Sequence, residues 1–74
     1  MEVNRMKYSV FIQFDEKDQI YVASIPELPG CKAHGITKEK ALEELEIACD
    51  LWIETAKEIG REIPEPTYYN PVTA

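Results

Sequence analysis

The sequence has few of the residues on which several classes of protein depend. No apolar run approaches the roughly 20 residues that cross a bilayer, so a membrane-spanning role is not expected. Eight basic residues stand against 14 acidic ones, which gives a formal net charge of −6. Nucleic-acid binding depends on clustered Lys and Arg, so direct nucleic-acid contact is disfavoured and a basic protein is the natural partner.

Cysteine and histidine are also scarce. Cys31, Cys49 and His34 do not make a disulfide framework, and zinc needs three or four protein ligands, so no metal or cofactor is expected. His34 has no evident nucleophile with an orienting acid, so no catalytic residue is predicted. The N-terminus carries no secretory signal, and we therefore expect a cytoplasmic protein whose two thiols pack as small apolar side chains.

The 74 residues are enough for one domain. A chain of this size buries about 60% of the surface that its unfolded form exposes, so its core is thin. We predict a single domain with its core at about residues 7–66 and an extended tail at 67–74. Self-association is the expected source of further stability, which predicts a homodimer or a higher homo-oligomer.

Alternating apolar side chains predict the strands. One strand is expected over 7–14 and a second over 19–25, joined by a turn over 15–18. Two prolines and a glycine over 26–30 then interrupt the pattern. A third, short strand over 31–34 would complete an antiparallel meander.

A long helix is predicted from about Lys38 to Ile59, with Thr37 as its N-cap and Gly60 as its C-terminal glycine. The proline-rich segment that follows can hold a short edge strand, so the predicted fold class is α+β in the order strand, strand, strand, helix, strand. Apolar residues at helical spacing are expected to cover the sheet: Ala41, Leu45, Ala48, Trp52, Ala56 and Ile59.

Acidic residues form a row on the helix face opposite the apolar residues. Like charges at these spacings destabilise a helix by about 0.2–0.5 kcal/mol per pair. A solvated outer face and a docking surface for a basic protein are both open interpretations. The residues predicted to bind a partner are Glu39, Glu43, Glu46, Asp50 and Glu54.

Three apolar side chains are predicted to form a self-interface. Phe11 and Tyr21 are expected to point away from the sheet face that carries Val10 and Ile12, toward the side that one helix cannot cover. Leu51 falls on a flank of the helix, outside the covering face. Scattered surface apolar residues are the alternative interpretation.

Two other functions stay open from the residues alone. A metal-dependent nuclease would draw carboxylates from Asp15, Asp18 and either Glu43 or Asp50. The first two occupy a turn, however, where carboxylates commonly serve the turn itself. A small regulatory or ligand-binding domain would use the loop over 26–35 as the rim of its pocket.

Taken together, the residues resemble the HicB-like antitoxin family of type II toxin–antitoxin systems. The resemblance spans about residues 7–66. The motifs that carry it are Tyr21-Val22-Ala23, Ile25-Pro26-Glu27-Leu28-Pro29-Gly30-Cys31, Gly35, Thr37, Ala41-Leu42, Leu51-Trp52, Gly60 and Ile63-Pro64-Glu65-Pro66.

The resemblance implies a truncated ribonuclease H-like fold that lacks the nuclease's catalytic acids, and therefore a protein that is not an enzyme; a divergent nuclease of that fold is the alternative. It also implies a partner, a small basic HicA-like toxin that cleaves RNA and whose catalytic histidine is blocked in the complex. The acidic balance of this chain suits such a partner through charge complementarity. Fuller family members add a C-terminal DNA-binding domain, and because the sequence ends at Ala74, direct DNA binding is not expected.

Overall fold

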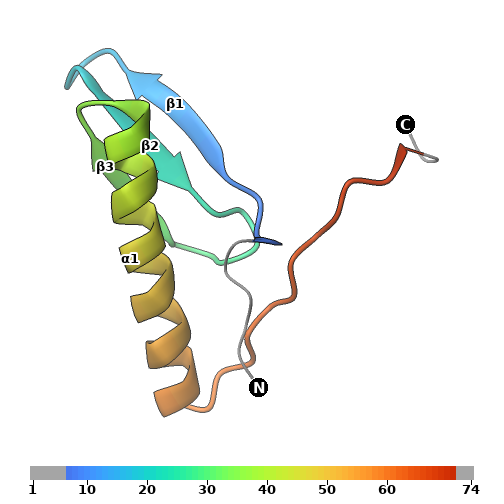
Figure 1. The fold of residues 1–74 in the computed structure, drawn as a ribbon. Coiled ribbons are helices and arrows are strands. Elements are labelled where there is room, and N and C mark those ends of the chain that lie inside the picture. The colour runs from blue at the N-terminus through green and yellow to red at the C-terminus, as the bar shows by residue number, and fades with distance from the viewer. Residues whose placement is uncertain (1–6, 72–74) are drawn as a thin grey trace.

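The computed structural model describes residues 7–71. Its elements follow in the order β1 (Phe11–Asp15), β2 (Ile20–Ser24), β3 (Lys32–Gly35) and α1 (Lys38–Glu58). The strands form one antiparallel sheet in the order β1-β2-β3, and α1 runs across one face of it (Figure 1). The predicted α+β class, with a three-stranded meander and one long helix, is confirmed.

The hairpin between β1 and β2 is built by its polar side chains. The Asp15 carboxylate accepts hydrogen bonds from the backbone N–H groups of Lys17 at 3.0 Å and Asp18 at 3.3 Å. Gln19 then adopts a positive φ of 57°, which returns the chain to β2. Asp15 therefore serves the turn, in the way that carboxylates in turns commonly do.

The strand register decides which side chains face α1. Ala23 pairs with Ile12 of β1 and with Ala33 of β3, and it is completely buried under the helix. Directly paired residues share a face of a sheet, so these three residues mark the covered face. Phe11 pairs with Ser24 and lies on the opposite, bare face, as predicted.

Tyr21 lies on the covered face, so the prediction that it shares the bare face with Phe11 is wrong. It pairs with Phe14 and with Gly35, two positions along β2 from the buried Ala23. The cause is the register set by the turn, which matches odd-numbered residues of β2 with even-numbered residues of β1. That register cannot be deduced from the alternation within either strand alone.

The buried face of α1 is close to the predicted one but is centred differently. Ala41, Leu45 and Ala56 are buried as predicted, while Ile59 is 69% exposed because it follows the last helical residue. Cys49 and Ile53, which were not placed on the covering face, are buried. Ala48 and Trp52 pack against the core from its edge.

Both predicted helix caps are confirmed. The Thr37 hydroxyl accepts a hydrogen bond from the Lys40 N–H at 3.0 Å. At the other end, the Gly60 N–H donates to the carbonyl of Lys57 at 3.3 Å, and the next N–H donates to the carbonyl of Ala56 at 2.8 Å. This pair of bonds is a Schellman motif, which the φ of 74° at Gly60 allows.

Gly35 lets the first turn of α1 lie directly on β3. A Cβ at this position would be 2.5 Å from the backbone nitrogen of Ala41 and 2.7 Å from the carbonyl carbon of Lys40. Backbone atoms fill the space that any side chain would need. The absence of a side chain at Gly35 therefore sets the distance between the helix and the sheet.

The segment after α1 does not form the predicted edge strand among the residues that the structure describes. Residues 61–70 have neither helical nor strand conformation. The segment leaves the end of α1 and then runs away from the sheet, as its orange and red ribbon shows (Figure 1). Residues 72–74 of the predicted tail lie outside the described residues.

Candidate functional site

The predicted acidic residues do lie together along one side of α1, and we call them the acidic row: Glu39, Glu43, Glu46, Asp50 and Glu54. All are exposed except Glu46, which is half-buried. Glu46 contributes to the wall of a groove between α1 and β1, so the acidic row lies on the β1 side of the outer helix face. The Thr37 cap and the packing of the buried face of α1 on the sheet fix the direction in which the acidic row faces.

Lys40 contacts the acidic row at Glu43. The Lys40 ammonium lies 3.8 Å from a carboxylate oxygen of Glu43 and 3.4 Å from one of Glu44, which is outside the row. All three side chains are at least 42% exposed, and ion pairs at such positions contribute little to stability because water screens them. The ion pair with Lys40 therefore contributes little to holding Glu43 in place.

Apolar side chains line the groove between α1 and β1, which has a volume of about 400 Å³. Val10 and Leu42 form its rim and both are exposed, while Leu45 and Cys49 form its floor. We call it the β1-side groove. It lies directly beside the acidic row, which it meets at Glu46.

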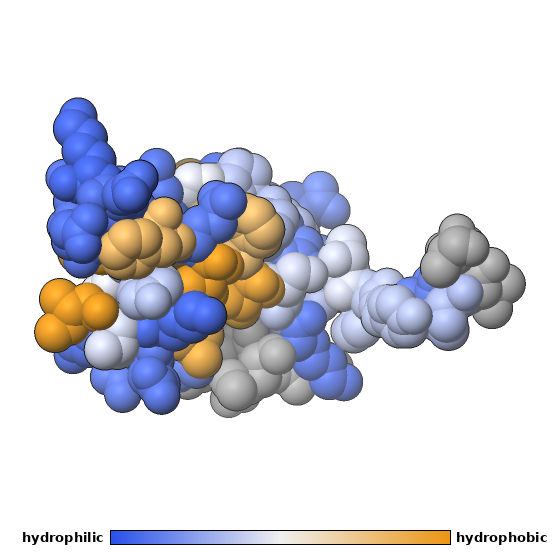
Figure 2. All heavy atoms as spheres, turned by 90° about the horizontal axis from the view of Figure 1, so that it is seen from above, coloured by the Kyte–Doolittle hydropathy of each residue, from blue (hydrophilic) through white to orange (hydrophobic). Residues whose placement is uncertain are grey.

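A second groove lies between β3 and α1 and has a volume of about 620 Å³. Its apolar rim is formed by Ile36, Ile47 and Leu51, all of them exposed. We call it the β3-side groove. Figure 2, which looks down on the molecule from above, shows apolar side chains reaching the surface among hydrophilic ones.

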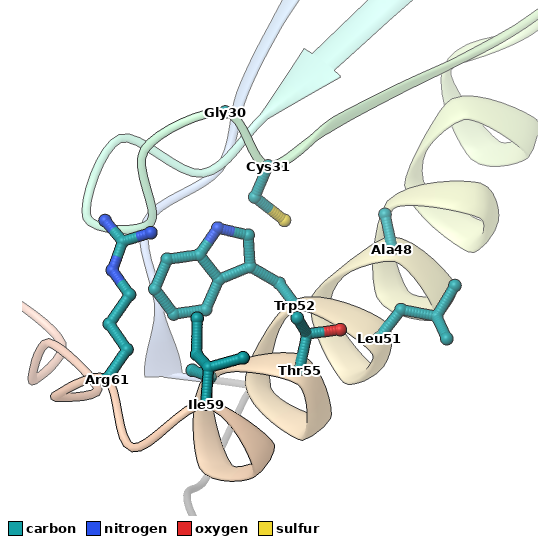
Figure 3. Close-up of a pocket in the computed structure, with 9 residues that line it drawn as sticks. Gly30, Cys31, Ala48, Leu51, Trp52, Thr55, Ile59 and Arg61 are labelled. Carbon is teal, nitrogen blue, oxygen red and sulfur yellow. The ribbon is translucent and has the colours of Figure 1, made fainter.

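A pocket of about 320 Å³ surrounds Trp52 near the end of α1 (Figure 3). The indole N–H donates to the carbonyl of Pro29 at 2.9 Å, and the Arg61 guanidinium lies 4.8 Å from the ring centroid. Cys31 lies at the inner wall, where burial raises the pKa of its thiol and keeps it protonated. The pocket shares Leu51 with the β3-side groove, so the two form one surface.

Glu27 ties together three parts of the chain. Its carboxylate accepts hydrogen bonds from the backbone N–H and hydroxyl of Ser9 and from the N–H and hydroxyl of Thr67, at 2.8–3.2 Å. Burial acts to raise the pKa of this carboxyl, but the hydrogen bonds from Thr67, its own backbone and Ser9 outweigh burial and lower the pKa to about 2. We call these contacts the Glu27 clasp.

Tyr8 reinforces the same region. Its hydroxyl donates to the carbonyl of Pro64 at 2.5 Å, and burial, with smaller effects from nearby acidic groups, raises the pKa of the phenol. The hydroxyl therefore remains a hydrogen-bond donor. Together with the Glu27 clasp, this bond holds the segment after α1 beside the residues that precede β1.

The structure separates the three residues predicted to form a self-interface. Phe11 is exposed on the bare sheet face, and Leu51 is exposed on the rim of the β3-side groove. Tyr21 is half-buried on the covered face, with its ring centroid 5.1 Å from that of Phe14 and the Lys38 ammonium 5.9 Å above it. These residues do not form one patch.

Within residues 7–71, no group of three or more His, Cys, Asp or Glu side chains is placed to hold a metal ion. The carboxylates considered for nuclease chemistry, Asp15 and Asp18 with Glu43 or Asp50, are thus not gathered into a metal site there. Cys31 and Cys49 are both buried in the core and neither is part of a disulfide, which confirms their predicted packing role. In the same part of the chain no helix has the length and apolar character that crossing a bilayer requires.

These features define a small α+β domain whose single helix carries an acidic row and is flanked by two largely apolar grooves. Its family can be stated directly. A profile of the HicB-like antitoxins of bacterial toxin–antitoxin systems matches residues 8–74. The chain belongs to this family.

Three similar proteins carry the description UPF0150 protein. One from Thermoplasma acidophilum is 44% identical over 59 residues, which cover 80% of this chain and 84% of that protein. One from Synechocystis is 52% identical over 44 residues, 60% of each chain. One from Archaeoglobus fulgidus is 33% identical over 54 residues, 73% of this chain and 77% of that protein. No solved structure matches the chain.

Proposed function

We propose that this domain is an antitoxin that binds and neutralises a small, basic, HicA-like toxin that cleaves RNA. It would act by covering its partner and not by catalysis. The observation that carries the proposal is the acidic row, which is displayed on the outer face of α1 in a member of the HicB-like antitoxin family. The formal net charge of −6 favours a basic partner in the same direction.

The architecture supports a binding role for the acidic row. The helix is capped at both ends and packed on the sheet, so the backbone positions that carry the acidic row are fixed before a partner arrives. Such preorganisation reduces the ordering cost of association. Because four of the five carboxylates are exposed, their attraction to a basic surface acts mainly on the association rate and is screened by salt.

The comparison with a truncated ribonuclease H-like fold is part of the same proposal. That fold would add a short terminal strand to the three strands and the helix. The support for it is that the Glu27 clasp brings Thr67 beside Ser9, two residues before β1 begins. Beyond Thr67 the segment runs away from the sheet (Figure 1), so the terminal strand would require that segment to fold back toward β1.

The test uses purified domain and a small basic toxin of the HicA class. We expect binding that weakens as salt is raised, together with inhibition of RNA cleavage. The double variant Glu43→Lys with Glu54→Lys reverses two charges of the acidic row, and we expect its affinity to fall by about tenfold or more. Calorimetric titration and an RNA-cleavage assay measure the two effects.

The matched control reverses two charges elsewhere. Glu16→Lys with Asp18→Lys changes the net charge by the same amount in the hairpin turn, away from α1, and is expected to change affinity by less than about threefold. Equal losses for the two double variants would mean that only overall charge matters. A wild-type domain that binds no toxin of this class would contradict the proposal.

A further inference from the structure

The β1-side groove leaves apolar surface open within the part of the chain that the structure describes. Its volume is about 400 Å³, and its rim consists of Val10, which is 44% exposed, and Leu42, which is 37% exposed. Its floor is fully apolar at Leu45 and Cys49. Contiguous apolar surface of this kind marks a place that another segment or molecule covers.

The residues before β1 lead into this groove. Tyr8, Val10 and Ile12 all line it, at steps of two residues. In an extended chain, residues two apart point to the same side. Met6 is the next position in this series, and it belongs to residues 1–6, which lie outside the described part of the chain.

Residues 1–6 have the length and the apolar content to cover the groove. Met1, Val3 and Met6 are apolar, and methionine fills irregular gaps well because its side chain is unbranched and flexible. Six extended residues span up to about 20 Å. The stretch of α1 that lines the groove, 42–49, spans only about 10 Å at the helical rise.

Charge favours the same placement. Arg5 directly precedes Met6 in the sequence. Glu46 forms part of the groove wall, and Asp50 follows it one helical turn later in the acidic row. Opposite charges attract more strongly where a groove excludes part of the water. A second copy of the chain would instead bring its own acidic row to this surface and be repelled.

The segment after α1 is not the occupant of the groove. Pro64 bonds to the Tyr8 hydroxyl and Thr67 bonds to the Glu27 carboxylate, and neither Pro64 nor Thr67 lines the groove. Beyond Thr67 the segment runs away from the sheet (Figure 1). The other end of the chain is therefore the better candidate.

We propose that residues 1–6 form a strap over the β1-side groove, with Met6 packed on its apolar side chains and Arg5 beside Glu46 and Asp50. The strap shields the apolar rim of the groove from water, and it places a basic residue of the same chain against one part of the acidic row. The proposal does not rest on toxin binding, because the strap and the groove belong to one chain.

Nuclear magnetic resonance of the full chain tests the strap directly. We expect nuclear Overhauser contacts from the Met6 methyl group to Ile25 and Leu45, which line the groove but are distant in the sequence. Met6→Asp places a charge in the groove and should shift the methyl resonances of Leu42 and Leu45. Leu51, on the β3 side of α1, is the internal control, and its unchanged resonances would show that the fold is intact.

A pair of charge reversals tests the contribution of Arg5. Arg5→Glu and Lys7→Glu change the net charge equally at positions two residues apart, and Lys7 is exposed. We expect Arg5→Glu to melt about 4 °C or more below Lys7→Glu, with a difference that shrinks in high salt. Thermal unfolding followed by circular dichroism measures it.

Several results would overturn the proposal. They are the absence of any contact between the Met6 methyl group and the groove, a Met6→Asp variant in which the resonances of Leu42 and Leu45 do not move, and equal melting temperatures for the two charge reversals. Wild-type Leu42 resonances that shift with protein concentration would assign the groove to a second copy and would contradict the strap equally.

Discussion

The two sides of α1 are stabilised in different ways. On the β3 side the helix lies directly on the strand, with backbone against backbone at Gly35, and its exposed residues are mostly apolar. On the β1 side the helix leaves an open groove beside the acidic row. The segment after α1 returns there to the residues before β1, held by Tyr8 and the Glu27 clasp. The β3 side is thus stabilised by close packing, and the β1 side by hydrogen bonds to the Glu27 carboxylate.

This difference shows how a domain of 74 residues can display two unlike surfaces without a second structural unit. A helix that covers one small sheet has a buried face and two flanks, and the sequence gives each flank its own composition. The acidic row lies on the β1 side, whereas the exposed Ile47 and Leu51 lie on the β3 side, near Lys40 and Glu44. Substitutions on each side of α1 test this difference, and their effects on the free energy of unfolding should differ in size and in pH dependence.

The largest effect is expected where the packing is closest. Gly35→Val introduces a side chain where backbone atoms of the first helical turn already lie 2.5–2.7 Å from the position of a Cβ. We expect the free energy of unfolding to fall by about 3 kcal/mol, at the upper end of the usual cost of overpacking. Urea denaturation measures it, and the loss should be the same at pH 7 and pH 4.

The matched control lies in the same strand. His34→Ala replaces an exposed side chain on the bare face and should change stability by no more than about 0.5 kcal/mol. If Gly35→Val were as harmless as this control, the close contact between β3 and α1 would not be a determinant of the fold.

An intermediate effect is expected at the Glu27 clasp. Glu27→Gln removes the charge that receives the hydrogen bonds from Ser9 and Thr67, and should cost about 1–3 kcal/mol at pH 7. The folded-state pKa of about 2 lies below the ordinary value of 4.5. The carboxylate therefore stabilises the fold above about pH 4.5, and this contribution is lost as the pH falls toward 2.

Urea denaturation at a series of pH values measures both parts of this prediction. The difference in stability between wild type and Glu27→Gln should shrink steadily below pH 4.5. Glu62→Gln, an exposed residue of the same segment, is the control and should behave as wild type does. A difference that stays constant down to acid pH would show that the charge of Glu27 does not hold the segment.

The smallest effect is expected in the acidic row. Glu43→Gln with Glu54→Gln removes two exposed charges from α1 and should change stability by no more than about 0.5 kcal/mol, with any gain largest at low salt. Thermal unfolding at two salt concentrations measures it. A loss well above this value would show that the acidic row serves folding, and would remove the reason to regard it as a binding surface.

Local sequence signals were sufficient for most of the fold. The hydroxyl of Thr37 and the freedom of Gly60 placed the ends of α1 to within one residue, because caps depend on neighbours in the chain. The pairing of strands is different. The predicted face of Tyr21 is wrong because its orientation depends on the register between β1 and β2. The turn sets this register, and the alternation of residues within a single strand does not reveal it.

The candidate site was predictable to the same extent. Helical spacing was enough to gather the acidic row, since one regular element carries all five residues. The Glu27 clasp was missed because Glu27 and Thr67 are 40 residues apart in the chain, and nothing near either residue indicates the other. The sequence predicts that Leu51 lies outside the covering face, but it does not predict that Cys49 and Ile53 lie at the centre of the buried face. That position of the centre is what leaves Ile47 and Leu51 exposed on the β3 side.

The Glu27 clasp also has a consequence for the order in which the molecule comes apart. A single carboxylate accepts from both Ser9 and Thr67, so one proton loosens all of these contacts together. The Schellman motif, the sheet and the helix packing contain none of these bonds. Acid should therefore release the chain around Thr67 first, while Tyr8 still holds Pro64, in a sub-global opening that precedes the collapse of the sheet and helix.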